Sequence, residues 1–125
     1  MNNLTQHSVA SINFNKLWEV SEGKKKMLLE ILRSIEKGLI EYPKEIEKAL
    51  KDNQPESLEK VAHKCKSCTN YLYHEEITQL LEALEQDGRG NNITLATADR
   101  VERLKFITAH TLPEVQKHIN LLEQL

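Results

Sequence analysis

The stretch LEKVAHKCKSCTNYL, residues 58–72, carries apolar residues at intervals of three and four. They are Leu58, Val61, Cys65, Cys68 and Leu72. Because an α-helix turns by about 100° per residue, this spacing places all of them on one stripe and predicts a helix that packs through one face. Free cysteine is among the most buried residue types. We therefore expect both cysteines to be small core residues.

The same helical spacing recurs along the rest of the chain. It runs from about Glu22 to Lys51, from Ile77 to Leu84, and from about Thr94 to the C-terminus. In the last of these segments the residues expected to face inward are Val101, Leu104, Thr108, Leu112, Val115, Ile119, Leu122 and Leu125. A shorter amphipathic element, INFNKLWEV, covers residues 12–20.

Prolines and glycines mark where these helices begin, end or bend. Pro43 is expected to kink or interrupt the first long helix, and Pro113 to interrupt the last one. Pro55 suits the first turn of the helix that contains residues 58–72. The run DGRGNN, residues 87–92, is a glycine-rich stop.

These elements predict an all-α protein. Alternating β-branched runs are missing from the sequence. Four amphipathic helices with short connections predict an antiparallel up-down four-helix bundle, with a short N-terminal helix packed on one end. The 125 residues suffice for one domain, expected over residues 13–125 after a flexible tail at residues 1–12.

The overall composition limits the partners and the compartment. The formal net charge of −2 provides no strong field for nucleic acid or an anionic membrane. No apolar run approaches the roughly 18 residues of a membrane span, and the N-terminus lacks the pattern of a signal peptide. Two cysteines without an export signal indicate free thiols in a reducing compartment, and we expect a cytoplasmic protein.

His63 lies about 180° from the middle of the apolar stripe, so we expect its side chain in solvent. The neutral form of an exposed histidine is available near pH 7 as a nucleophile. Lys66, one turn further on, would stabilise an added dianion such as a phosphoryl group. The alternative reading is a solvated helix face that happens to contain a histidine.

The pair Cys65 and Cys68 raises the question of a metal or redox site. A zinc site would need a second ligand pair, and a redox motif would need a βαβ context. The sequence contains neither, and His63 points away from both thiols on the helical wheel. We therefore predict no metal site.

The stretch AHKCKSCTNYLYHEEI, residues 62–77, resembles the signature of histidine-containing phosphotransfer (HPt) domains. That signature is His, any residue, an apolar residue, Lys, Gly and small residues, with a later Gly and an apolar residue. The resemblance extends over about residues 14–125 in the order of elements. It implies a four-helix bundle, His63 as the phosphoacceptor and Lys66 as the residue that stabilises the phosphoryl charge. LLEALE, residues 80–85, resembles the family's Leu-Glu pattern on the helix behind the histidine.

Two positions depart from the family pattern. Ser67 stands where the family has the glycine that leaves room for a docking partner, and its hydroxyl can bond back to the backbone four residues earlier. Tyr73 stands in place of the later glycine, at the turn after the helix.

The resemblance implies a phosphorelay intermediate of two-component signalling that has no kinase activity of its own. His63 would accept a phosphoryl group from a receiver-domain aspartate and pass it to another receiver. The partners would be receiver domains of response regulators or hybrid sensor kinases, docking on the face that carries Lys60, Lys64, Ser67 and Asn70. No cofactor is expected on this chain, since Mg²⁺ would be bound by the receiver. The alternative is a non-catalytic helical bundle that binds receivers without carrying phosphate.

The remaining titratable residues receive structural predictions. His74 is expected in a turn or cap role, and His110 and His118 at the surface or its boundary. Glu82 and Glu85 are expected on a solvated helix face.

Overall fold

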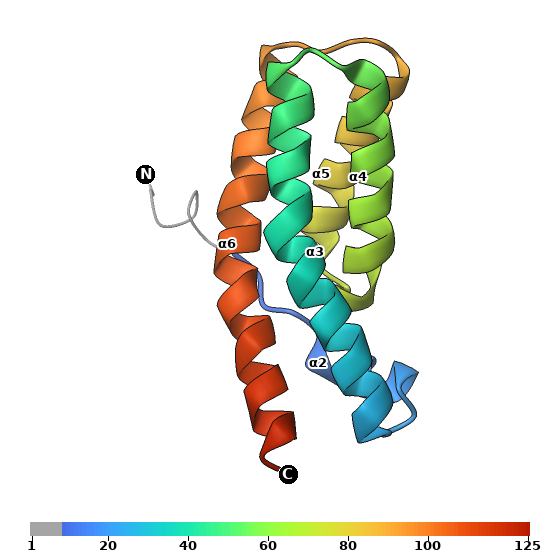
Figure 1. The fold of residues 1–125 in the computed structure, drawn as a ribbon, viewed down its shortest axis with the longest axis vertical. Helices are drawn as coiled ribbons and strands as arrows, with labels where there is room; N and C mark the ends of the chain where they lie inside the picture. Colours follow the sequence, from blue (N-terminus) through green and yellow to red (C-terminus); the bar gives the residue numbers. More distant parts are fainter. Residues whose placement is uncertain (1–8) are drawn as a thin grey trace.

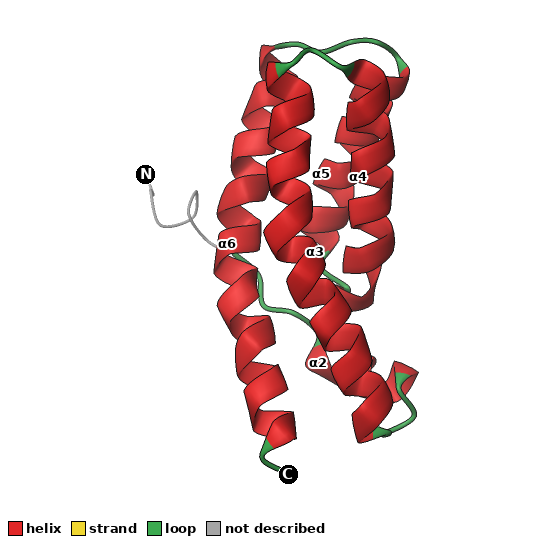
Figure 2. Cartoon of the chain, viewed as in Figure 1, coloured by secondary structure: helices red, strands yellow, loops and turns green. Residues whose placement is uncertain are grey.

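The chain is all-helical in a computed structural model that describes residues 9–125. Its helices are α2 (Phe14–Val20), α3 (Lys25–Lys51), α4 (Pro55–Thr69), the 3₁₀-helix η1 (Asn70–Leu72), α5 (Glu75–Arg89) and α6 (Leu95–Glu123). Turns and loops join them, and no β-strand occurs between residues 9 and 125 (Figure 2). The predicted all-α class is confirmed.

The long helices pack around a common aliphatic core. Helix α3 contacts α4 and α6, and α5 contacts the same two helices (Figure 1). The core contains side chains from every long helix, among them Leu28, Leu32, Ile35, Leu58, Leu81, Leu84, Leu104 and Ile107. Burial of such side chains contributes about 1.5–3 kcal/mol each, so the apolar stripes are what hold the helices together.

The helix boundaries follow the local sequence signals. Pro55 occupies the first turn of α4, and α5 ends with Gly90 as its C-cap. A capping box of Thr94 and Thr97 begins α6, where each side chain accepts from the backbone N–H of the other residue.

The expectation that Pro113 interrupts its helix is wrong. Helix α6 runs without a break through Pro113, and α3 likewise runs through Pro43. A proline inside a helix costs about 3 kcal/mol, and the packed apolar residues on both sides of it outweigh that loss.

The buried stripe of α4 is rotated slightly from the predicted one. Ala62 and Thr69 are buried, whereas Val61 and Cys68 are only half-buried, because α4 is packed between α3 and α5 and not against one helix alone. Leu125 is 85% exposed and does not face inward as predicted, since α6 ends at Glu123.

The segment before α2 lies against the helices. Ile12 is buried, and its backbone N–H lies 3.3 Å from a carboxylate oxygen of Glu114 on α6. Asn13 donates its N–H to the carbonyl of Leu72, 3.2 Å away. Of the predicted flexible tail, residues 1–8 lie outside the described part of the chain, and the remaining residues lead into these contacts.

His74 connects this segment to the start of α5. Its Nδ1 accepts from the N–H of Ile77 at 3.2 Å, so it caps the helix. Its Nε2 therefore carries the proton and donates to the carbonyl of Ala10 at 3.1 Å. The predicted cap role is confirmed.

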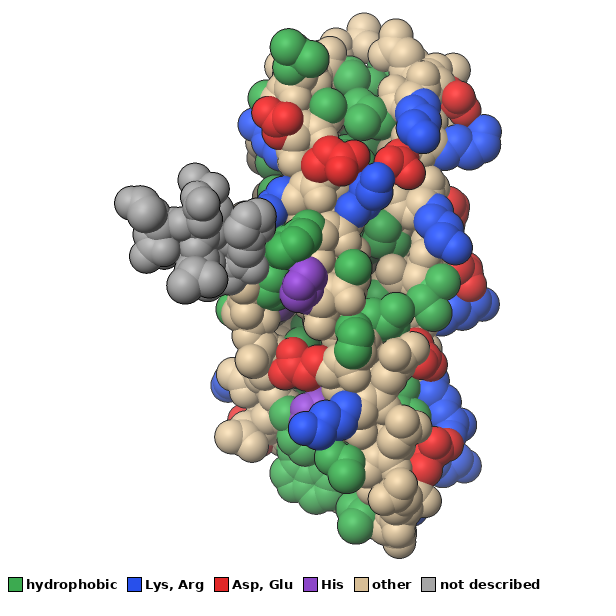
Figure 3. All heavy atoms as spheres, turned by 90° about the vertical axis from the view of Figure 1, so that its left-hand side faces the viewer, with side chains coloured by type: hydrophobic (Ala, Val, Ile, Leu, Met, Phe, Trp, Pro, Cys, Tyr) green, Lys and Arg blue, Asp and Glu red, His purple; other side chains and the backbone are tan. Residues whose placement is uncertain are grey.

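Apolar side chains also gather at the surface where α2 meets the end of α6, toward the lower end of the view in Figure 3. They border an open groove of about 510 Å³ whose lining includes Phe14, Trp18, Leu121 and Leu125. His118 lies at this boundary and stacks on Phe14 with ring centroids 4.2 Å apart. None of the helices within residues 9–125 has the length and apolarity to cross a membrane.

Candidate functional site

His63 projects from the middle of α4 on the side that faces α5. Its side chain is 60% exposed, as its position opposite the apolar stripe predicted. The ring is nevertheless anchored, because its Nδ1 lies 3.2 Å from Oε2 of Glu85 on α5. One ring nitrogen is therefore engaged with the protein while most of the ring faces solvent.

Glu85 is the centre of a charged cluster between α4 and α5. The residue is only 8% exposed, so the expectation of a solvated glutamate is wrong. The ammonium of Lys66 lies 3.0 Å from Oε1, as an ion pair outside good hydrogen-bond geometry. Nη2 of Arg89 lies 3.0 Å from Oε2, and Nε of the same guanidinium lies 2.8 Å from Glu59.

The protonation state of Glu85 determines the tautomer of His63. Burial alone would raise the pKa of Glu85, but the interaction with Lys66, followed by that with His63, outweighs burial and holds this pKa below its ordinary value. Glu85 is therefore an ionised acceptor at neutral pH, and the proton of the hydrogen bond sits on Nδ1 of His63. Nε2 of the neutral ring then keeps a free lone pair.

A shallow depression lies beside the histidine. Its volume is about 440 Å³, and it is lined by Glu59, Lys60, His63, Lys64, Glu85 and Arg89. We call it the His63 hollow. It contains three cationic side chains, and both of its carboxylates are ion-paired with Arg89. A small anion attached to His63 would find cations on this side of the ring.

The predicted partner-binding residues surround His63 on the surface of α4 and at its end. Lys60, Lys64, Ser67 and Asn70 are all exposed. Lys66, by contrast, is 21% exposed and leans onto α5, where Glu82 lies 3.9 Å from its ammonium in addition to Glu85. The structure thus brings Lys66 together with His63 through a shared carboxylate.

The two departures from the HPt signature have structural explanations. The hydroxyl of Ser67 donates to the carbonyl of His63 at 3.1 Å, as predicted, so it lies back along its own helix. Tyr73 has a φ of +52°, in the left-handed region that favours glycine. The turn after η1 therefore places a tyrosine in a backbone conformation that favours glycine.

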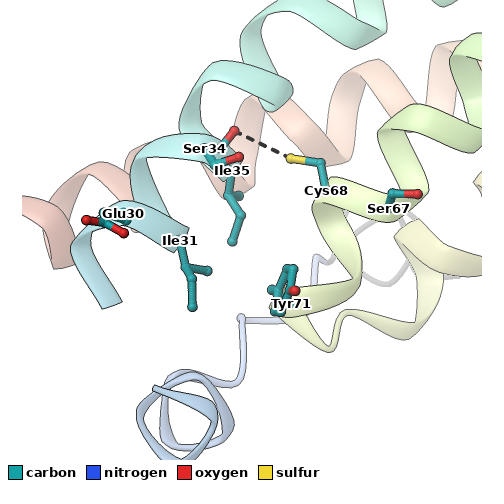
Figure 4. A pocket seen from close by; sticks show the side chains of 7 residues that line it. All are labelled: Glu30, Ile31, Ser34, Ile35, Ser67, Cys68 and Tyr71. Atoms are coloured by element: carbon teal, nitrogen blue, oxygen red, sulfur yellow. Dashed lines mark hydrogen bonds between the residues drawn. The ribbon is translucent and has the colours of Figure 1, made fainter. Parts of the chain in front are cut away.

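The cysteines are placed as packing residues. Cys65 is fully buried, and burial raises the pKa of its thiol to about 12. Burial also raises the pKa of the half-buried Cys68 to about 11. Figure 4 shows the thiol of Cys68 pointing from α4 to the carbonyl of Ser34 on α3, at 3.5 Å, while Ser67 points the other way. In the described part of the chain, no group of three or more His, Cys, Asp or Glu side chains could hold a metal ion.

Two residues of the site were not predicted as site residues from the sequence: Glu85 and Arg89. One signal for Glu85 was available. It lies four residues after Leu81 and three before Gly88, on the stripe of α5 that is otherwise buried and apolar. A carboxylate on such a stripe needs a cationic or hydrogen-bonding partner. The identity of that partner depends on how α4 and α5 pack.

No family model, curated protein or solved structure matches this chain.

Proposed function

We propose that this chain relays phosphoryl groups between receiver domains, with His63 as the phosphoacceptor. The observation that carries the proposal is the orientation of the ring. Nδ1–H is held by buried Glu85, and the free Nε2 belongs to a side chain that is 60% exposed in the middle of a helix. An anchored ring with one free lone pair in solvent suits in-line attack on a phosphorus atom presented by another protein.

The transfer step follows from this arrangement. The Nε2 lone pair attacks the phosphorus of an aspartyl phosphate, and an N–P bond forms as the P–O bond to the aspartate breaks. The aspartate leaves as a carboxylate, and the imidazole ring becomes positively charged. Glu85, held ionised against Nδ1–H, stabilises that charge, as a carboxylate does for an imidazolium in other enzymes. Passing the group to a second receiver is the reverse reaction.

The docking face we propose consists of Lys60, Lys64, Ser67 and Asn70 around His63, all of which are exposed. Lys66 supports the site by holding Glu85 and adds positive charge near the ring. Mg²⁺ would be bound by the acidic residues of the receiver. With the Mg²⁺ site on the receiver and the phosphoacceptor on this chain, the chain acts as a phosphotransfer protein without kinase activity of its own.

The finer architecture that we propose is an antiparallel up-down four-helix bundle with α2 packed on one end. The contacts of α3 and α5 with both α4 and α6 support it, as does the contact of α2 with η1. The short connections between consecutive helices support it too. We also propose a cytoplasmic location, where Cys65 and Cys68 stay free thiols.

The proposal is tested by phosphoryl transfer from a panel of phosphorylated receiver domains, with Mg²⁺, to the wild type, His63→Gln and His110→Gln. His110 is a matched control because it is also exposed on a helix. We expect acid-labile label on the wild type and His110→Gln and none on His63→Gln. If some receivers bind all three proteins equally and none labels the wild type, the chain is a docking protein and not a phosphate carrier.

A further inference from the structure

His63 and Arg89 approach the same oxygen atom. Nδ1 of His63 lies 3.2 Å from Oε2 of Glu85, and Nη2 of Arg89 lies 3.0 Å from that atom. The two nitrogens are therefore at most about 6 Å apart. Lys66 approaches the other oxygen, Oε1. Arg89 thus shares a carboxylate oxygen with His63, and Lys66 pairs with the other oxygen.

Arg89 has unused capacity to bind an anion. Its side chain is 62% exposed, and its two ion pairs use Nε and Nη2. A guanidinium carries five N–H donors in a planar fork that matches phosphate oxygens, so donors remain for a third group. Arg89 also lines the His63 hollow, which Lys66 does not.

Lys66 is less available than Arg89. Its side chain is 21% exposed, and its ammonium lies between two carboxylates, 3.0 Å from Glu85 and 3.9 Å from Glu82. To reach a phosphoryl group on Nε2 it would have to give up its ion pair with Oε1 of the buried Glu85, an oxygen that pairs with no other cation in the described part of the chain, and this is costly. Arg89 can retain its ion pair with Glu85 while it exchanges its ion pair with the more exposed Glu59 for one with the phosphoryl group.

We propose that Arg89 is the cation that pairs with the phosphoryl group on His63, and that Glu59 competes with this group for Arg89. The inference rests on the proposed function and names the charge partner within it. A phosphoryl dianion offers three acceptor oxygens and a larger charge than one carboxylate, so it draws the guanidinium away from Glu59. Lys66 is then a positioning residue that acts through Glu85.

The test measures the charge around the phosphoryl group directly. The protein is phosphorylated with potassium phosphoramidate, and the ³¹P shift of phosphohistidine is followed against pH in variants with equal helical circular dichroism. Arg89→Gln should move the midpoint of the phosphoryl titration to higher pH by about half a unit or more, and Lys66→Gln by less. Glu59→Gln should move it to lower pH, by more than the control Glu56→Gln. Glu56 is on the same helix and pairs with Lys60 at 3.4 Å.

The proposed competition for Arg89 also predicts how the substitutions of Glu59 and Arg89 combine in a double variant. In the Arg89→Gln background, Glu59→Gln should lose more than half of its effect, because the guanidinium it competed for is gone. An undiminished effect, or a larger shift in Lys66→Gln than in Arg89→Gln, would overturn the inference while leaving His63 as phosphoacceptor. A wild type that forms no phosphohistidine would overturn the proposed function itself, and this inference with it.

Discussion

At the scale of single residues, Glu85 gives His63 its chemistry. A buried carboxylate that stays ionised can only accept hydrogen bonds, so it fixes the proton on Nδ1 and leaves Nε2 free. Lys66, and after it His63, keep the pKa of Glu85 low in a partly desolvated place, and Arg89 pairs with the same carboxylate. Loss of the carboxylate charge should therefore affect both the stability of the fold and the reactivity of the histidine.

Glu85→Gln should lower the free energy of unfolding by about 1–2 kcal/mol at pH 7, because two cations lose their shared partner. The folded-state pKa of Glu85 lies below its ordinary value of 4.5. The stabilisation is therefore complete above that ordinary value and is lost as the pH falls through the folded-state pKa. Urea unfolding of the wild type and Glu85→Gln between pH 3 and 8 should show a difference in the free energy of unfolding. This difference should become smaller only at acidic pH.

Glu82→Gln is the matched control for this experiment. Glu82 is also on α5 and faces Lys66, but its side chain is 53% exposed and the separation is 3.9 Å. We expect a small change in the free energy of unfolding for this variant, with little dependence on pH. A difference between wild type and Glu85→Gln that stayed constant to pH 3 would mean that Glu85 is not held ionised.

At the scale of elements, the site is a product of the close approach of α4 and α5. Gly88 makes that approach possible. A Cβ at residue 88 would lie 2.5 Å from the carbonyl oxygen of Pro55 and 2.6 Å from the amide nitrogen of Glu59. These are backbone atoms, which cannot rotate away as a side chain can. The same crossing brings Arg89 within reach of Glu59.

Gly88→Ala should therefore push the two helices apart and lower the free energy of unfolding by about 1–3 kcal/mol. It should also slow phosphorylation of His63, since the distance from Nδ1 to Glu85 would grow. Gly90→Ala is the control, because a Cβ there would meet only the carbonyl of Gln86 at 3.3 Å. Chemical denaturation and labelling kinetics of both variants would check this. Equal stability of the two variants would show that α4 and α5 do not depend on this contact.

At the scale of the whole molecule, the sequence correctly predicted those features of the structure that depend on the helical spacing of apolar residues. The helical class, the burial of Cys65 and the exposure of His63 all follow from positions on a wheel, and all three are confirmed. The prediction that Pro113 interrupts α6 is wrong, because packing on both sides of the proline outweighs its low helix propensity.

The charged cluster could not be predicted in the same way. Glu85 and Arg89 reach His63 from another helix, across a separation of 22 residues for the first of them. Which charges meet across two helices depends on their rotation and distance, and these are set by contacts such as that of Gly88. A helical wheel of one helix contains no information about which side chains of a neighbouring helix will contact it.

The central claim is that Nε2 of His63 is the phosphoacceptor. The most direct test is the position of the N–P bond after reaction of the ¹⁵N-labelled protein with phosphoramidate, read from the ¹⁵N and ³¹P couplings of the imidazole ring. The geometry predicts a bond to Nε2 of His63, with Nδ1 still bonded to hydrogen. Phosphorus on Nδ1, or equal labelling of the His63→Gln variant, would contradict the account.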